Sequence, residues 1–128
     1  MPLDVRQDVV VNDLFSSDRM SWEIVEYFEQ TYRNATVEWS GSVTRVSKYQ
    51  RDLDFGVGPG IKATVLIGHA GVSDVISNEV HAVVQLPADA SVPGGVGIRT
   101  GDQIRFRGLL TNVDRFSRKI WVQHANLL

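Results

Sequence analysis

Residues 101–110, GDQIRFRGLL, decide the fold that the sequence predicts. After a Gly-Asp turn the side chains alternate, so that Ile104 and Phe106 share one face while Arg105 and Arg107 share the other. A period of two is typical of a β-strand with one buried face. The stretch therefore predicts a strand whose apolar face lies in the core of the protein.

Four further segments have the character of strands. Residues 119–125, KIWVQHA, are expected to pair antiparallel with the first strand across a polar turn at residues 112–117. The three remaining strands are expected at residues 37–46, 61–68 and 79–86. The segments between them, residues 47–60 and 87–100, are rich in glycine, proline and polar residues and are expected to form loops.

Two glycines interrupt these β-prone runs at positions where a side chain is expected. They are Gly41, in the first strand, and Gly108, in the fourth. A glycine inside a strand commonly marks a bulge, a sharp bend or a close approach of another backbone. We expect such a feature at one or both positions.

The segment before the strands predicts a single helix. Residues 1–16 have no sustained period and are expected to form an extended arm, whereas residues 18–33 carry an apolar stripe at helical spacing. The stripe consists of Met20, Ile24, Tyr27, Phe28 and Tyr32. An N-cap at residues 16–18 and a stop at Asn34 bound this helix. We expect it to pack on the strands, with binding of a partner as the alternative.

The length of 128 residues and the hydrophobic content of 43% predict one compact domain, in which residues 1–33 pack on a barrel formed by residues 34–128. Its longest apolar runs have four or five residues, far below the roughly 20 that cross a bilayer. Residues 1–8 lack the apolar core of an export signal. The absence of cysteine excludes disulfides and thiolate metal sites. We therefore expect a cytoplasmic location and no membrane partner.

The net charge of −2 hides an asymmetry along the chain. Residues 1–35 contain seven acidic and three basic side chains, whereas residues 99–128 contain six basic and two acidic ones. A basic surface at the C-terminal end permits an anionic partner. Charges spread evenly around a solvated barrel are the alternative.

The order of these elements resembles the OB-fold, a small five-stranded Greek-key barrel, and in particular its bacterial tRNA-anti-like branch. The resemblance covers about residues 34–128. It rests on residues 37–43 (VEWSGSV), 101–108 (GDQIRFRG) and 120–127 (IWVQHANL). It implies a five-stranded barrel, which together with the helix expected at residues 18–33 gives a mainly β protein with one N-terminal helix. Many members of this group bind single-stranded DNA or RNA, although the fold also serves as a protein-interaction module.

In OB-folds the ligand face is built by the second and third strands with the first and fourth loops, which here are expected at about residues 47–60 and 111–119. Both loops place a cation beside an aromatic ring, the pair that binds phosphates and stacks on bases. The candidate nucleic-acid-binding residues are Arg45, Lys48, Tyr49, Arg51, Phe55, Arg105, Arg107, Arg115, Phe116, Arg118 and Lys119. For Phe106 and Trp121 we expect packing in the core.

Enzymatic chemistry is not indicated. The three histidines lack the spacing of a metal site, and Asp52 and Asp54 lack the further oxygen ligands of a calcium loop. The glycine cluster at residues 56–60 is followed by neither a helix nor the Lys-Ser/Thr of a phosphate loop, so a flexible turn is expected. We expect no catalysis, no cofactor and no metal.

The second functional hypothesis is a protein-interaction or oligomeric scaffold module built on a small barrel. In that case the acidic helix at residues 18–33 would contact the basic surface of a neighbouring copy. Salt distinguishes the two hypotheses, because phosphate binding weakens steeply with ionic strength and assembly through an apolar patch does not.

Overall fold

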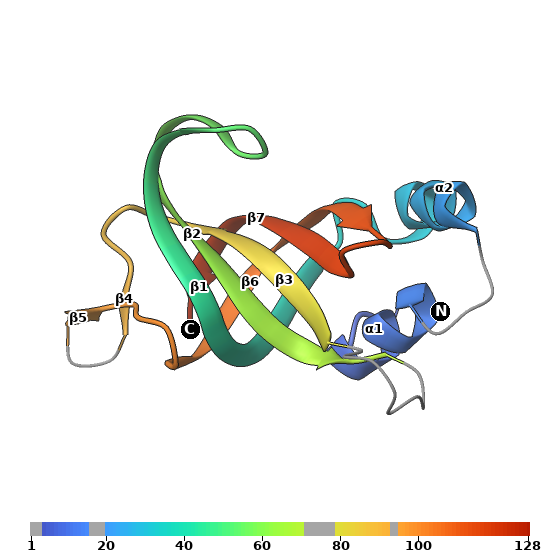
Figure 1. The fold of residues 1–128 in the computed structure, drawn as a ribbon, viewed down its shortest axis with the longest axis horizontal. Helices are drawn as coiled ribbons and strands as arrows, with labels where there is room; N and C mark the ends of the chain where they lie inside the picture. Colours follow the sequence, from blue (N-terminus) through green and yellow to red (C-terminus); the bar gives the residue numbers. More distant parts are fainter. Residues whose placement is uncertain (1–3, 16–19, 71–78, 93–94) are drawn as a thin grey trace.

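The computed structural model describes residues 4–15, 20–70, 79–92 and 95–128. Within these residues two helices precede a closed barrel of five strands (Figure 1). The helices are α1 (Gln7–Phe15) and α2 (Ser21–Thr31). The barrel strands are β1 (Thr36–Asp52), β2 (Gly56–His69), β3 (Glu79–Leu86), β6 (Gln103–Asp114) and β7 (Lys119–Leu127). Neither helix is long and apolar enough to cross a membrane.

The strands follow the order β1-β2-β3-β7-β6 around the barrel, and β6 pairs with β1 to close it. The neighbouring strands are antiparallel except for β3 and β7, which are parallel over residues 81–84 and 119–122. The antiparallel pair predicted at the C-terminal end is confirmed as β6 and β7. In β6 the predicted alternation is also confirmed, since Ile104 and Phe106 are buried while Arg105 and Arg107 are exposed.

The prediction of one helix is wrong, because the expected arm at residues 1–16 contains α1. Val10, Val11 and Leu14 of α1 are buried, and the helix packs on β2 and β1. A run of β-branched valines has little helical character of its own, so burial against the barrel decides its conformation. In Figure 1 both helices lie toward one end of the molecule.

The predicted helix at residues 18–33 corresponds to the shorter α2. Its expected N-cap at residues 16–18 lies entirely outside the described residues, and Met20 occupies the N-cap position of α2. Met20 is exposed, in contrast to its expected place in the apolar stripe, whereas Ile24 and Phe28 are buried. Asn34 has a φ of 69°, a left-handed conformation that asparagine tolerates and that ends the helical path.

The expected loop at residues 47–60 is wrong, because β1 and β2 continue through it as a long hairpin with a turn at residues 53–55. Tyr49 pairs with Gly60, and a Cβ atom on Gly60 would collide with the Tyr49 hydroxyl. The glycine therefore makes room for the ring within the ladder, although glycine is generally unfavourable in strands. In Figure 1 this hairpin rises from the barrel and its tip bends over.

The two other expected loops are also shorter than predicted. The segment at residues 111–119 contains the end of β6 and the start of β7, and only residues 115–118 form the turn. The connection at residues 87–100 contains a small hairpin of β4 (Ser91–Val92) and β5 (Val96–Gly97). This hairpin lies at the opposite end of the molecule from the helices (Figure 1).

Close approaches at Gly41 and Gly108 are confirmed. A Cβ atom on Gly41 would overlap the carbonyl oxygen of Leu66. A Cβ atom on Gly108 would lie 2.6 Å from Cγ1 of Val122 and 2.9 Å from Cβ of Ala125. The β6–β7 register also shifts between Arg107 and Leu109, on either side of Gly108. Both glycines are therefore required by the tight curvature of the barrel.

The N-terminal segment is fixed to the barrel by side-chain hydrogen bonds. Gln7 Nε2 donates to the carbonyl oxygens of Ser40, at 2.7 Å, and Ile67, at 2.6 Å. The buried Trp39 donates its Nε1–H to the carbonyl oxygen of Val5 at 2.9 Å. These bonds satisfy polar groups where the helical segment covers the strands.

Candidate functional site

One row of side chains crosses four strands on the outer surface of the barrel. Arg45 of β1 pairs with Thr64 of β2, Thr64 with Val83 of β3, and Val83 with Trp121 of β7. Together with Lys62 and Lys119, these residues form the surface that we call the Trp121 face. These side chains point outward from the barrel and come from β1, β2, β3 and β7.

The prediction that Trp121 packs in the core is wrong. Its neighbours Ile120 and Val122 are buried inside the barrel, so the period of two places Trp121 on the outside, where it is half-buried. Its Nε1 atom is shielded from solvent and has no hydrogen-bond partner among the described residues. Val83 beside it is buried although it does not belong to the core cluster. Phe106, by contrast, is fully buried in the core as predicted.

A cleft of about 340 Å³ lies on the Trp121 face, and we call it the cationic cleft. Arg45, Lys62, Lys119 and Trp121 line it together with Asp52 of the β1–β2 hairpin and further residues. The remaining lining residues are Ser47, Asp54, Thr64 and Val83. The cleft thus combines three cations, two carboxylates and an indole ring.

The two carboxylates are both committed to Lys62. The Nζ atom of Lys62 lies 3.2 Å from Asp52 Oδ1 and 3.0 Å from Asp54 Oδ2. Although partial burial opposes it, these contacts hold the pKa of Lys62 above its ordinary value. Likewise, despite desolvation, the backbone N–H groups of Asp54 and Phe55 together with Lys62 hold the pKa of Asp52 below its ordinary value. The hairpin therefore neutralises one cation of the cleft.

Arg45 and Lys119 are the cations of the cleft that remain available. Among the described residues, neither forms a salt bridge. Lys119 pairs in register with His81 of β3. Burial, together with the charges of Lys119 and Arg118, holds the pKa of His81 below its ordinary value, so His81 is neutral near pH 7. Arg45, the first residue of the row, and Lys119, two residues before Trp121, thus supply two positive charges on this face.

The β1–β2 hairpin carries three of the sequence-predicted residues, none of which is among the residues that line the cationic cleft. Tyr49 and Phe55 are half-buried, with ring centroids 6.1 Å apart, and the Tyr49 hydroxyl accepts a hydrogen bond from Gln85 at 3.1 Å. Lys62 Nζ lies 5.7 Å from the centre of the Phe55 ring. Arg51 is exposed on the same hairpin. The pairing of cation and aromatic ring expected here therefore exists, although Lys62 supplies the cation.

The β6–β7 turn carries the second group of predicted residues. Phe116 is 82% exposed at the turn, and Arg115 beside it is half-buried. The Nε–H of Arg118 donates to the carbonyl oxygen of Glu79 at 3.3 Å, which directs this side chain toward β3. Lys119 follows directly and lines the cationic cleft.

The remaining predicted residues lie elsewhere. Arg107 forms a salt bridge with Glu38 on β1, and Arg105 Nη2 lies 3.6 Å from the same carboxylate. These contacts hold the pKa of Glu38 below its ordinary value. Lys48 lines a different cleft, beside the β4–β5 hairpin. The structure thus places Arg105, Arg107 and Lys48 outside the cationic cleft.

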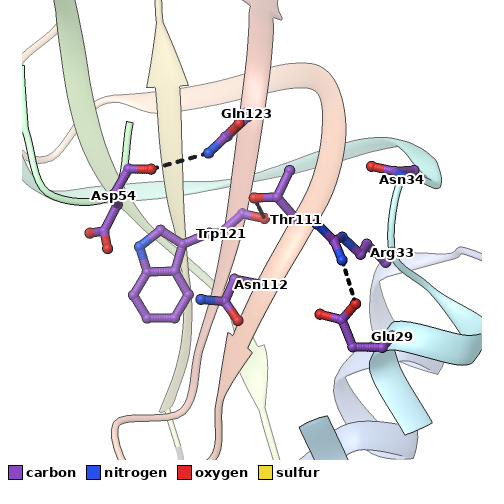
Figure 2. Close-up of a pocket in the computed structure, with 8 residues that line it drawn as sticks. All are labelled: Glu29, Arg33, Asn34, Asp54, Thr111, Asn112, Trp121 and Gln123. Carbon is purple, nitrogen blue, oxygen red and sulfur yellow. Dashed lines mark hydrogen bonds and ion pairs between the residues drawn. The ribbon is translucent and has the colours of Figure 1, made fainter. Parts of the chain in front are cut away.

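Figure 2 shows a larger cleft of about 430 Å³. Two of its lining residues, Trp121 and Asp54, also line the cationic cleft. We call the larger cleft the amide cleft, because Asn34, Asn112 and Gln123 line it. Its other lining residues are Glu29, Arg33 and Thr111. Gln123 Nε2 donates to the backbone oxygen of Asp54 at 3.2 Å, so the tip of the β1–β2 hairpin is tied to β7.

Sequence reasoning missed Lys62, Trp121 and the amide cleft. Strict alternation through residues 120–122 would have placed Trp121 outside, because both of its neighbours are aliphatic β-formers suited to the core. The amide cleft has no sequence signal, since α2, β6, β7 and the hairpin tip meet there only in the folded chain. In the described part of the chain, no group of three or more histidine and carboxylate side chains is arranged to hold a metal.

Comparison with protein-family models, curated proteins and solved structures finds no match to this chain.

Proposed function

We propose that this chain is an OB-fold domain that binds single-stranded nucleic acid through the Trp121 face. The topology supports the fold assignment. Strands β1, β2 and β3 pair in sequence, and β6 then returns across a long connection to lie beside β1. A fourth strand that returns beside the first is the arrangement of a Greek key. Closure by β7 between β3 and β6 gives five strands, as in an OB barrel.

The single observation that carries the functional proposal is the row from Arg45 to Trp121. Cations that lack a carboxylate partner attract phosphates, and an aromatic ring on the outer surface offers a face on which a base stacks. Arg45 and Lys119 supply the first element and Trp121 the second. Phe55, next to Lys62, and the exposed Phe116 of the β6–β7 turn offer further aromatic rings.

The arrangement favours a single strand over a duplex. Stacking on a side chain requires a base whose face is exposed, and bases in a duplex are covered by their neighbours. The carboxylates Asp52 and Asp54 lie in the same cleft and repel phosphates, so affinity is expected to be moderate and strongly dependent on salt.

The test is a binding titration at low salt with short fluorescently labelled single-stranded DNA and RNA, and with a duplex of the same length. We expect micromolar binding of the single strands and weaker binding of the duplex. Absence of binding to single strands at tens of micromolar protein would exclude this function.

A second candidate function, protein association, is favoured by one observation on α2. Trp22 is 68% exposed and Val25, one turn further, is 42% exposed, so the two share a face of the helix. Large exposed apolar groups of this kind often lie at protein interfaces. Sedimentation of the wild type and of Trp22→Gln at low and high salt tests this function. A concentration-dependent dimer that persists in high salt and is lost in the variant would support it, and a monomer throughout would exclude self-association.

A further inference from the structure

We propose that the amide cleft is the pocket for one nucleobase of the bound strand and gives the protein a base preference. This inference rests on the proposed function, because it requires a strand on the Trp121 face. The volume of the amide cleft, about 430 Å³, falls in the range of small-molecule sites. It opens beside Trp121, which also lines the cationic cleft, so one indole borders both sites.

The charge of the amide cleft suits a neutral ring and not a phosphate. Among the described residues that line it, Arg33 is the only cation, and Arg33 Nη1 lies 2.7 Å from Glu29 Oε2 in a salt bridge. Asp54 adds a second carboxylate to the lining. A phosphate would therefore meet net negative charge in the amide cleft, whereas Arg45 and Lys119 attract it to the neighbouring cationic cleft.

The hydrogen-bonding groups beside the indole form a complementary pair. Asn112 is the register partner of Trp121 on β6, and its Oδ1 accepts the N–H of Val113 at 2.9 Å. Its Nδ2 then remains a donor without an acceptor among the described side chains and backbone. Gln123 uses Nε2 as a donor to Asp54, at 3.2 Å, and therefore presents Oε1 as an acceptor. The Asn112 donor and the Gln123 acceptor lie on either side of the Trp121 indole. Together they match the donor and acceptor groups on the edge of a base.

Side-chain amides that read a base edge discriminate between bases, whereas cations on phosphates do not. The two clefts therefore have different roles in binding. The cationic cleft supplies affinity that depends on salt, and the amide cleft supplies preference among bases that does not. Asn126 offers a matched control. It is an exposed asparagine on β7, the strand that also carries Gln123, but it lies beside Tyr49 in another cleft.

The test compares the affinities of short dA, dC and dT oligonucleotides for the wild type, Asn112→Ala, Gln123→Met and Asn126→Ala at low and moderate salt. We expect the wild type to separate the best and worst oligonucleotides by about five- to tenfold. Asn112→Ala and Gln123→Met, which leave the charge of the cleft unchanged, should reduce or reorder this separation without changing the dependence of affinity on salt. Asn126→Ala should behave as the wild type.

The indole N–H resonance of Trp121, assigned through Trp121→Phe, gives a second readout that does not depend on affinity. It should shift when the preferred oligonucleotide is added, while the resonance of the buried Trp39 stays in place. Equal affinities for the three oligonucleotides, or a preference untouched by both amide variants, would overturn the base pocket and leave the proposed function standing. Absence of binding to any oligonucleotide would overturn both.

Discussion

The ammonium group of Lys62 lies 3.0 Å from the carboxylate of Asp54, at the tip of the hairpin that borders the proposed binding face. This contact places a negative charge where a phosphate is expected and occupies one of the three cations of the cleft. The hairpin therefore limits the affinity of the face for an anionic strand.

Asp54→Asn is expected to strengthen binding of single-stranded DNA. The variant removes a like charge from the path of the phosphates and one of the two carboxylates that contact Lys62, while Asp52 remains as its partner. The gain should be about two- to fivefold, because one exposed charge pair is worth up to about 1 kcal/mol. Glu26→Gln removes the same charge from the exposed side of α2 and should leave the affinity unchanged. Weaker binding by Asp54→Asn would show that the carboxylate supports the site and does not oppose the ligand.

Trp121→Ala is expected to weaken binding by about 1–3 kcal/mol, the usual value of one stacked base. Trp121→Phe, which keeps an aromatic face, should lose less binding free energy. Trp22→Ala removes an exposed tryptophan of α2 and serves as the matched control. Binding titrations with one oligonucleotide compare the three variants. An equal loss of affinity in Trp22→Ala and Trp121→Ala would contradict binding of the strand at the Trp121 face.

Gly41→Ala and Gly108→Ala are each expected to lower the free energy of unfolding by about 1–3 kcal/mol, because the added methyl group has no room. Gly97→Ala is the control, since nothing lies within 4 Å of a Cβ atom there. Its effect should stay within about 0.5 kcal/mol. Urea unfolding measures all three. If the Gly41 and Gly108 variants were as stable as Gly97→Ala, tight curvature at these glycines would be refuted.

The barrel was predictable from the sequence because its signals are local. Alternation through residues 101–110 indicates a strand whatever lies around it, and Gly41 and Gly108 stand out against β-prone neighbours. The long β1–β2 hairpin was not predictable, because Gly58 and Gly60 argue against a strand until Tyr49 is placed over Gly60. The valines of α1 likewise take a helical form only against the barrel.

The candidate site was predictable only in part. The sequence indicates Lys119 and the two turns as basic and aromatic, and the structure brings Lys119 together with Arg45. It could not indicate that Glu38 pairs with Arg105 and Arg107, because Glu38 is distant in sequence and adjacent only through the β1–β6 pairing. The same holds for the amide cleft, whose residues come from four separate elements.

Tyr32 makes the stability of the protein depend on alkaline pH. It is buried, and its hydroxyl donates to Asp13 Oδ2 at 2.6 Å. Burial and this hydrogen bond raise the pKa of Tyr32 above its ordinary value. The folded state therefore keeps a proton that the unfolded chain loses above about pH 10. The stability that this proton contributes is complete below that pH and is lost as the pH rises further.

The free energy of unfolding of the wild type should accordingly fall above about pH 10 more steeply than that of Tyr32→Phe. At neutral pH, Tyr32→Phe should cost about 1–3 kcal/mol, because Asp13 loses a donor. Urea unfolding at a series of pH values measures both effects. The free energy of unfolding of Tyr49→Phe, which retains Tyr32, should fall with rising pH as that of the wild type does. Parallel curves for the wild type and Tyr32→Phe would contradict this role of Tyr32.

The central claim, that the Trp121 face binds the phosphates of a single strand, is tested most directly by the dependence of affinity on salt. The measurement is the slope of log K against log salt concentration for the wild type, Arg45→Ala/Lys119→Ala and Arg105→Ala/Arg107→Ala. Each phosphate contact contributes about −0.7 to this slope for a single strand, so the first double variant should flatten it by about 1.4. The second, whose arginines are engaged by Glu38, should keep the wild-type slope. A wild-type slope in Arg45→Ala/Lys119→Ala, or a slope flattened only in Arg105→Ala/Arg107→Ala, would contradict the account.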